Sequence, residues 1–173
     1  MKIIAFAASS SRKSINKQLV TYAAGLIPDA EIEVLDLNDY EMPIFSEDRE
    51  YETGIPVLAQ QFFNKISQCD ALVISFAEHN GSYSAAYKNV FDWCSRINAQ
   101  VYQGKATILL ATSPGPGGAS SVLGAATGSA AYFAADLKAS LSIPKFYDNF
   151  DIEKGCLKEG ELDRQLQTVM AKL

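Results

Sequence analysis

The sequence predicts an α/β fold, in which a doubly wound, five-stranded parallel sheet carries helices on both faces. Residues 2–8, 71–77 and 106–112 form nearly unbroken apolar runs that are rich in branched side chains. Such runs are typical of strands that are covered on both faces. Helical patterns separate the runs, and this alternation of strand and helix favours a parallel sheet.

Two weaker segments complete the predicted sheet. Residues 31–37 alternate between apolar and polar side chains, as expected of a strand near an edge, and residues 139–144 predict the fifth strand. Residues 38–54 predict a long irregular loop, and long loops inside compact domains are often functional. The predicted helices cover approximately residues 15–26, 56–68, 83–98, 118–137 and 160–172.

The composition predicts a single soluble domain over residues 1–173. Apolar residues make up 48% of the chain and charged residues 20%, which is close to the average for globular proteins. The net charge of −5 argues against a nucleic-acid partner, and no apolar run is long enough to cross a membrane. Three cysteines without close pairing or metal spacing favour a reducing cytoplasm and argue against disulfides and a zinc site.

The first candidate binding loop is "ASSSRKSIN", residues 8–16, directly before a predicted helix. Ligands of such sheets bind beyond the carboxyl ends of the strands, and a helix N-terminus attracts a phosphate. Lys13 and Lys17 stand in or near the first turn, where they disfavour a bare helix start and favour a bound anion. The alternative is that Ser14 only caps the helix.

A dinucleotide site is a weaker alternative for this loop. Asp36 lies about 20 residues further on, where a ribose-binding acid would stand. Residues 1–24, however, contain no glycine, and the dinucleotide fingerprint needs three. Hydroxyl and amide side chains around a terminal monophosphate fit a mononucleotide better.

Two further loops follow the third and fourth predicted strands. The first contains Glu78, His79, Asn80, Gly81, Ser82 and Tyr83. Asn80-Gly81 predicts a turn that leaves backbone amides open for a flat heterocycle, although Ser82 or Ser84 capping the next helix is an equally good explanation. The second, "TSPGPGG" at 112–118, is rigid and lacks side-chain bulk, so a ligand can approach its backbone closely.

Together, the three loops resemble the NAD(P)H-dependent FMN reductases of flavodoxin-like fold, which include quinone, azo-dye and chromate reductases. The family pattern G-S-x-R-x-x-S-x-N is similar to residues 8–16, and P-E-Y-N-G-S-Y-P-G-x-L-K-N-x-x-D-W is similar to residues 77–93. The third pattern, S-x-G-x-x-G-G, is met by Ser113, Gly115 and Gly118. The resemblance covers essentially the whole chain.

The resemblance implies a flavin site at these loops. Ser9, Ser14 and Asn16 would hold the FMN phosphate, together with Ser11 or Arg12, because Ser11 occupies the family's arginine position and Arg12 follows it. The implied residues around the ring and ribityl chain are Glu78, His79, Asn80, Gly81, Ser82, Tyr83, Ser113, Gly115 and Gly118.

The resemblance also implies an activity: hydride transfer from NADPH or NADH to FMN, and onward to a quinone, an azo compound or a similar small-molecule acceptor. No catalytic residue is assigned, and His79 and Tyr83 are the nearest candidates for contact with the second substrate. The alternatives are a flavodoxin-like FMN electron carrier without nicotinamide activity and a binding module without turnover. The basic first loop, which lacks the carriers' glycine, favours the reductase.

A homodimer or homotetramer is also implied by the resemblance, with the 38–54 loop of one subunit near the flavin of another. Residues 118–139 are crowded with small side chains, which allow close packing against the sheet or a partner subunit. Tyr83, Tyr87 and Phe91 recur at helical spacing and fit a core or a subunit interface equally well.

Overall fold

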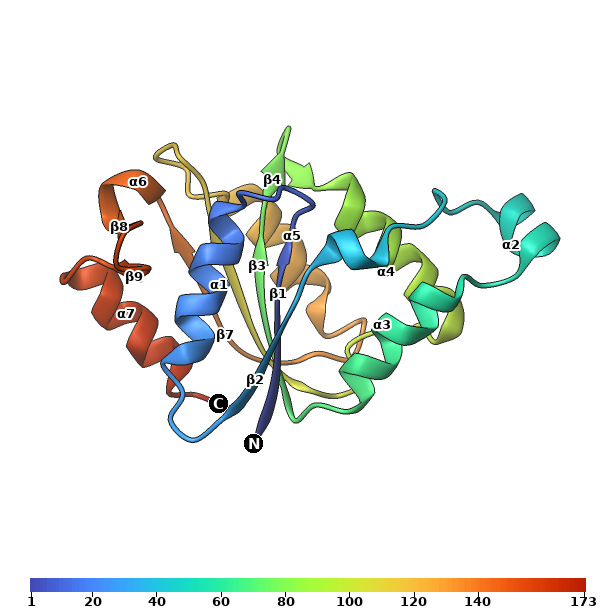
Figure 1. The fold of residues 1–173 in the computed structure, drawn as a ribbon, viewed down its shortest axis with the longest axis horizontal. Coiled ribbons are helices and arrows are strands. Elements are labelled where there is room, and N and C mark those ends of the chain that lie inside the picture. The colour runs from blue at the N-terminus through green and yellow to red at the C-terminus, as the bar shows by residue number, and fades with distance from the viewer.

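A five-stranded parallel sheet forms the centre of the computed structural model, which describes residues 1–173 (Figure 1). Its strand order is β2-β1-β3-β6-β7, so the chain starts at an inner strand, moves to one edge and then crosses to the other side. The doubly wound sheet predicted from the sequence is therefore confirmed. The strands are β1 (Lys2–Ala8), β2 (Glu31–Leu35), β3 (Ala71–Phe76), β6 (Ala106–Thr112) and β7 (Asp136–Ile143).

Helices cover both faces of the sheet, because side chains on its strands alternate between two buried cores. Ile3 and Ala5 of β1 belong to the core beneath α1 (Ile15–Gly25) and α7 (Glu161–Met170). Ile4 and Phe6 belong to the opposite core. That core lies beneath α3 (Val57–Ser67), α4 (Ala85–Ile97) and α5 (Ser120–Ala130).

The register of the inner strands brings three loops to one level. Ala8 pairs with Phe76, and Phe76 pairs with Ala111. The segments that follow β1, β3 and β6 therefore leave the sheet side by side at its carboxyl edge, at the top of Figure 1.

The segment 38–54 differs from the predicted loop. It contains part of a 3₁₀ helix, η1 (Leu37–Tyr40), and a short helix, α2 (Glu47–Thr53). Ser46 caps α2 by accepting a hydrogen bond from the Arg49 amide at 3.2 Å. Glu47 and Asp48 in its first turn stabilise the helix, because their negative charges lie near the positive end of the helix dipole. No residue of α2 is buried, and Figure 1 shows it on an arm that projects from the body.

The end of the helix predicted over 118–137 and the start of the strand predicted over 139–144 also differ from the sequence prediction. The helix expected over 118–137 ends at Ala130, since the chain turns through Ala134, which has a φ of 59°, and β7 begins at Asp136. Short elements that the hydrophobic pattern does not show also appear: β4 (Glu78–His79), β5 (Ser82–Tyr83), α6 (Phe146–Asn149), β8 (Phe150–Asp151) and β9 (Cys156–Leu157).

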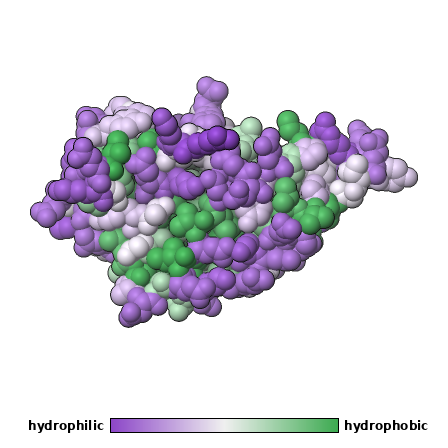
Figure 2. Space-filling view, viewed as in Figure 1, coloured by the Kyte–Doolittle hydropathy of each residue, from purple (hydrophilic) through white to green (hydrophobic).

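Strand β2 forms one exposed edge of the sheet. The face in Figure 2 is mostly hydrophilic, and its hydrophobic residues gather near the centre, over β2. Ile32 on this strand is 36% exposed, whereas the residues of β1 after Lys2 are all buried. The predicted placement of this strand near an edge is confirmed.

No helix is both long and apolar enough to cross a membrane. The three cysteines are free thiols; Cys69 and Cys94 are buried, and Cys156 is partly exposed. Burial raises the pKa of the Cys94 thiol to about 12, so this thiol stays protonated at neutral pH.

A pair of buried tyrosines links α4 to the turn that follows it. Tyr87 and Tyr102 are each 4% exposed, and their hydroxyl groups form a hydrogen bond at 2.8 Å. Burial raises the pKa of both phenols, so both are neutral at physiological pH. The pair therefore satisfies polar atoms inside an otherwise apolar core.

We predict that Tyr102→Phe and Tyr87→Phe each lower the free energy of unfolding by roughly 1–3 kcal/mol, because each leaves the other hydroxyl buried without its partner. The double variant should lose less than the sum of the two single variants. Urea denaturation of the three variants measures this. Additive losses would show that the hydroxyls do not stabilise each other.

Candidate functional site

A cleft of about 250 Å³ opens at the carboxyl edge of the sheet, between the loops after β1, β3 and β6. All three loops and α6 contribute side chains, so segments far apart in the sequence converge here. The cleft is lined by Ser9, Ser11, Lys13, Ser14, Ile15, Asn16, Ala77, Glu78, His79, Thr112, Ser113, Pro114 and Tyr147.

The first loop offers unpaired backbone amides at the start of α1. The Ser14 side chain caps the helix by accepting from the Lys17 amide at 3.2 Å, and Ser14 also lines the cleft. The backbone N–H groups of Arg12, Lys13, Ile15 and Asn16 nevertheless have no acceptor within the chain. With no acidic residue in the first turn of α1, this loop is suited to an anion.

Of the two lysines expected near an anion, only Lys13 lines the cleft. Lys17 instead forms an ion pair with Asp36 at 2.5 Å. The hydrogen bond from Lys17 holds the pKa of the Asp36 carboxyl below its usual range, with help from the Asn38 amide. Asp36 is thus already paired, which further weakens the dinucleotide alternative.

The side chain of Asn16 connects α1 to two strands. Its Oδ1 accepts hydrogen bonds from Ser75 Oγ at 2.8 Å and from the Thr112 amide at 3.1 Å. Its Nδ2 donates to the Thr112 carbonyl at 3.2 Å, and the residue is 3% exposed. The side chain therefore positions the loops. Because its polar atoms are already paired, only the backbone N–H of Asn16 is free to bind a phosphate, and that contact stays a prediction.

The second loop is a two-residue hairpin. Glu78 pairs with Tyr83, and His79 pairs with Ser82. Asn80 and Gly81 form the turn with φ values of 52° and 76°. Both values are positive, as the usual tight hairpin turn requires, which explains why Asn-Gly stands here.

Ser84 caps the helix that follows this hairpin. Its Oγ accepts from the Tyr87 amide at 3.2 Å and donates to the Ala8 carbonyl at 2.8 Å. Of the two serines proposed as caps from the sequence, Ser84 is the correct one. Because Ala8 ends β1, this residue also fixes the start of α4 beside the first loop.

Backbone hydrogen bonds from the segment after β7 fix the third loop. Phe146 and Lys145 donate backbone hydrogen bonds to the carbonyls of Ser113 and Gly115 at 3.0 and 2.9 Å. The N–H groups of Gly115 and Gly117 have no acceptor in the chain, and a Cβ at Gly115 would meet open space. This part of the loop is therefore accessible to a ligand.

Gly118 is required for packing. It has a φ of 58°, and a Cβ there would lie 2.2 Å from Ser142 Oγ, which donates a hydrogen bond to the Gly118 carbonyl. Gly115 and Gly118 were both predicted to contact the ligand, but their surroundings differ. A side chain would have room at Gly115 and would clash at Gly118.

Seven of the predicted site residues do not line the cleft: Arg12, Asn80, Gly81, Ser82, Tyr83, Gly115 and Gly118. Tyr83 faces a separate cavity of about 330 Å³ between α4 and α5, where its ring packs on Tyr87. Tyr147 lines the cleft but was not predicted, because the sequence interpretation treated only three strand ends. The carboxyl end of the fifth strand reaches the same edge and could have indicated it.

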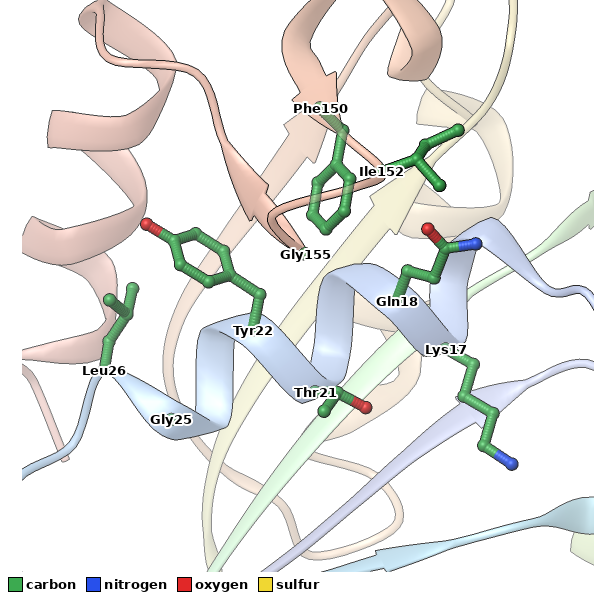
Figure 3. A pocket seen from close by; sticks show the side chains of 9 residues that line it. All are labelled: Lys17, Gln18, Thr21, Tyr22, Gly25, Leu26, Phe150, Ile152 and Gly155. Atoms are coloured by element: carbon green, nitrogen blue, oxygen red, sulfur yellow. The ribbon is translucent and has the colours of Figure 1, made fainter.

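The largest cavity, of about 570 Å³, lies elsewhere, between the outer face of α1 and the β8–β9 hairpin (Figure 3). Its titratable groups are already paired: Tyr22 Oη donates to Asp163 at 2.6 Å, and Lys17 extends away from Phe150 toward its partner Asp36. No predicted site residue lines this cavity, so size alone does not identify the functional site.

The strand order and the cleft define the class of protein. They describe a flavodoxin-like protein whose cleft presents backbone amides and hydroxyl groups in place of a glycine-rich dinucleotide loop. A profile of the family described as NADPH-dependent FMN reductase matches residues 1–148. The chain belongs to this family and is an oxidoreductase, as the loop motifs predicted.

Individual relatives agree with this assignment. The chain is 31% identical to a 2-hydroxy-1,4-benzoquinone reductase of Burkholderia sp. over 99% of this chain and 93% of that protein. It is 32% identical to an NAD(P)H-dependent FMN reductase of Pseudomonas aeruginosa over 66% of this chain and 61% of that one. The solved structure of the flavoenzyme FerB from Paracoccus denitrificans matches 98% of this chain and 93% of its own, with a TM-score of 0.81 at 20% identity, which supports the fold.

We predict that Asn16→Ala lowers the free energy of unfolding of the flavin-free protein by roughly 2–4 kcal/mol, because buried groups on β3 and β6 lose their partner. Ser14→Ala should lose about 1 kcal/mol, the usual value of a helix cap. Asn64→Ala, at an exposed helix position, is the control and should stay within about 0.5 kcal/mol of the parent. If urea denaturation gave equal stabilities for the Asn16 and Asn64 variants, the positioning role of Asn16 would be refuted.

Proposed function

We propose that the cleft binds FMN, with its phosphate at the N-terminus of α1. The observation that carries this proposal is the set of four unpaired amides, those of Arg12, Lys13, Ile15 and Asn16. A phosphate there would meet several N–H donors and the positive end of the helix. Lys13 lines the same cleft and would balance the charge, while Ser9 and Ser11 would add hydroxyl groups.

The second and third loops would hold the ring. The open space beside Gly115 and the free amides of Gly115 and Gly117 fit the polar edge of a flat heterocycle. The β4–β5 hairpin would border the opposite side, with Asn80 and Gly81 at its tip. The hydrogen-bond donors and the open space of these loops match the polar groups and the flat ring of FMN. The whole chain would then form a single flavin-binding domain.

When bound, FMN supplies the hydride and electron chemistry itself. The protein contributes binding, orientation and N–H donors that favour negative charge on the ring. No side chain of the cleft needs to act as an acid or base. His79 lines the cleft and is exposed, so it could contact a second substrate.

We propose NADPH or NADH as the electron donor and a quinone as the acceptor. The family description supports the donor. The relative that aligns with nearly the whole chain is named for a benzoquinone substrate, which supports a quinone more directly than an azo compound. A reducing cytoplasm is the proposed location, in keeping with three free thiols.

We also propose that two or four copies associate through α4 and α5. Gly124, Ala125 and Gly128 lie on the exposed face of α5, and a Cβ at either glycine would meet nothing within the chain. Exposed helical glycines cost about 1 kcal/mol each relative to alanine, so close approach of another helix would explain them. The aromatic cavity between α4 and α5 and the 80% exposed Tyr132 add apolar surface.

The flavin proposal is tested by adding FMN to the purified protein and then NADPH or NADH without oxygen. We expect binding, followed by bleaching of the visible flavin band at the rate of turnover. Gly115→Val should bind FMN more weakly because its side chain fills the open space. Gly25→Val, at the far end of α1, is the matched control. Bound flavin that neither nucleotide reduces would support an electron carrier, and absence of binding would refute the site.

For the assembly, light scattering should give a mass of two or four times 18.8 kDa. Gly128→Glu should shift the protein toward the monomer, because a charge would be buried in the interface. Gly25→Glu on α1 is the control and should leave the mass unchanged. A monomer in the parent protein would contradict the proposal.

A further inference from the structure

Helix α5 starts without a cap of its own. Its N-cap residue, Ala119, has a left-handed φ of 61° and no side-chain oxygen, and the first turn contains no acidic residue. The amides at a helix start need acceptors, and they carry a partial positive charge. The local sequence provides no side chain for this purpose.

The missing acceptor comes from the second loop, 44 residues earlier in the chain. Glu78 Oε2 accepts a hydrogen bond from the Val122 amide at 2.9 Å. Val122 is in the first turn of α5, and Glu78 is the first residue of the β4–β5 hairpin. A carboxylate at a helix N-terminus forms a charge-assisted bond and also balances the helix dipole.

This bond joins two loops that are otherwise fixed to different parts of the sheet. The third loop is tied to α6 and β7. Residues 78–83 make no other hydrogen bond to a segment outside the hairpin, although Tyr83 packs on Phe76 and Tyr87. The separation of the second and third loops therefore depends strongly on one carboxylate.

We infer that Glu78 is a positioning residue, which docks the β4–β5 hairpin onto the N-terminus of α5 and so sets the spacing of the two loops across the cleft. Its consequence for FMN rests on the proposed function, whereas the docking itself does not. Glu78 acts here mainly as an acceptor at a defined distance, so glutamine keeps the hydrogen bond and loses only its charge assistance. Aspartate keeps the charge but is one methylene too short.

The test is amide hydrogen exchange of the flavin-free protein, read at residues 78–83 and 119–123. Glu78→Ala and Glu78→Asp should accelerate exchange of the Val122 amide about tenfold, the value of one lost hydrogen bond of about 1.4 kcal/mol. Glu78→Gln should retain most of the protection. Glu159→Ala removes an exposed glutamate far along the chain and is the control for charge.

The exchange rates of these variants show whether the inference holds. Unchanged exchange in Glu78→Ala, or protection in Glu78→Asp together with its loss in Glu78→Gln, would overturn the inference. If Glu78→Ala does not fold, the comparison of glutamine with aspartate still decides. FMN titration is the second measurement: the dissociation constant should rise about tenfold in Glu78→Asp and less in Glu78→Gln. If even the parent bound no FMN while the exchange pattern held, the proposed function would fail and the docking would stand.

Discussion

The buried carboxamide of Asn16 is the constraint on which the cleft depends. It lies in the first turn of α1 and makes three hydrogen bonds to residues of β3 and β6. Through them, the helix start is fixed against the strands whose following loops form the rest of the site. The residues of this helix start consequently line one cleft together with the second and third loops.

The sheet could be predicted from the sequence because its strands are covered on both faces. Long apolar runs have few other stable solutions in a chain of this size, and their order in the chain fixes a parallel arrangement. The meeting of the three loops at one edge was predictable for a related reason, since the carboxyl ends of parallel strands lie at the same edge of such a sheet. Short elements such as α2 and the β8–β9 hairpin bury little apolar surface and leave no periodic pattern.

The roles of individual side chains were harder to predict, because they depend on partners that are distant in the sequence. Glu78 lines the cleft as predicted, but no pattern in the sequence indicated that its carboxylate also caps a helix that starts more than forty residues later. Lys17 looked like a counter-charge for a phosphate, but Asp36 is its partner. Residue type and position at the strand ends predicted which loops meet at one edge of the sheet, whereas hydrogen-bond partners required three-dimensional distances.

The exposed strand β2 affects how copies of this chain can meet. An open sheet edge offers unpaired backbone groups to a strand of another molecule, and such edges promote aggregation. Here Glu31 and Glu33 alternate along the strand, and Lys2 and Lys65 form ion pairs with Glu33. A second β2 would have to bring like charges together, so these acids oppose continuation of the sheet from one molecule to the next. The edge is protected by charge, and the helical faces remain available for ordered assembly.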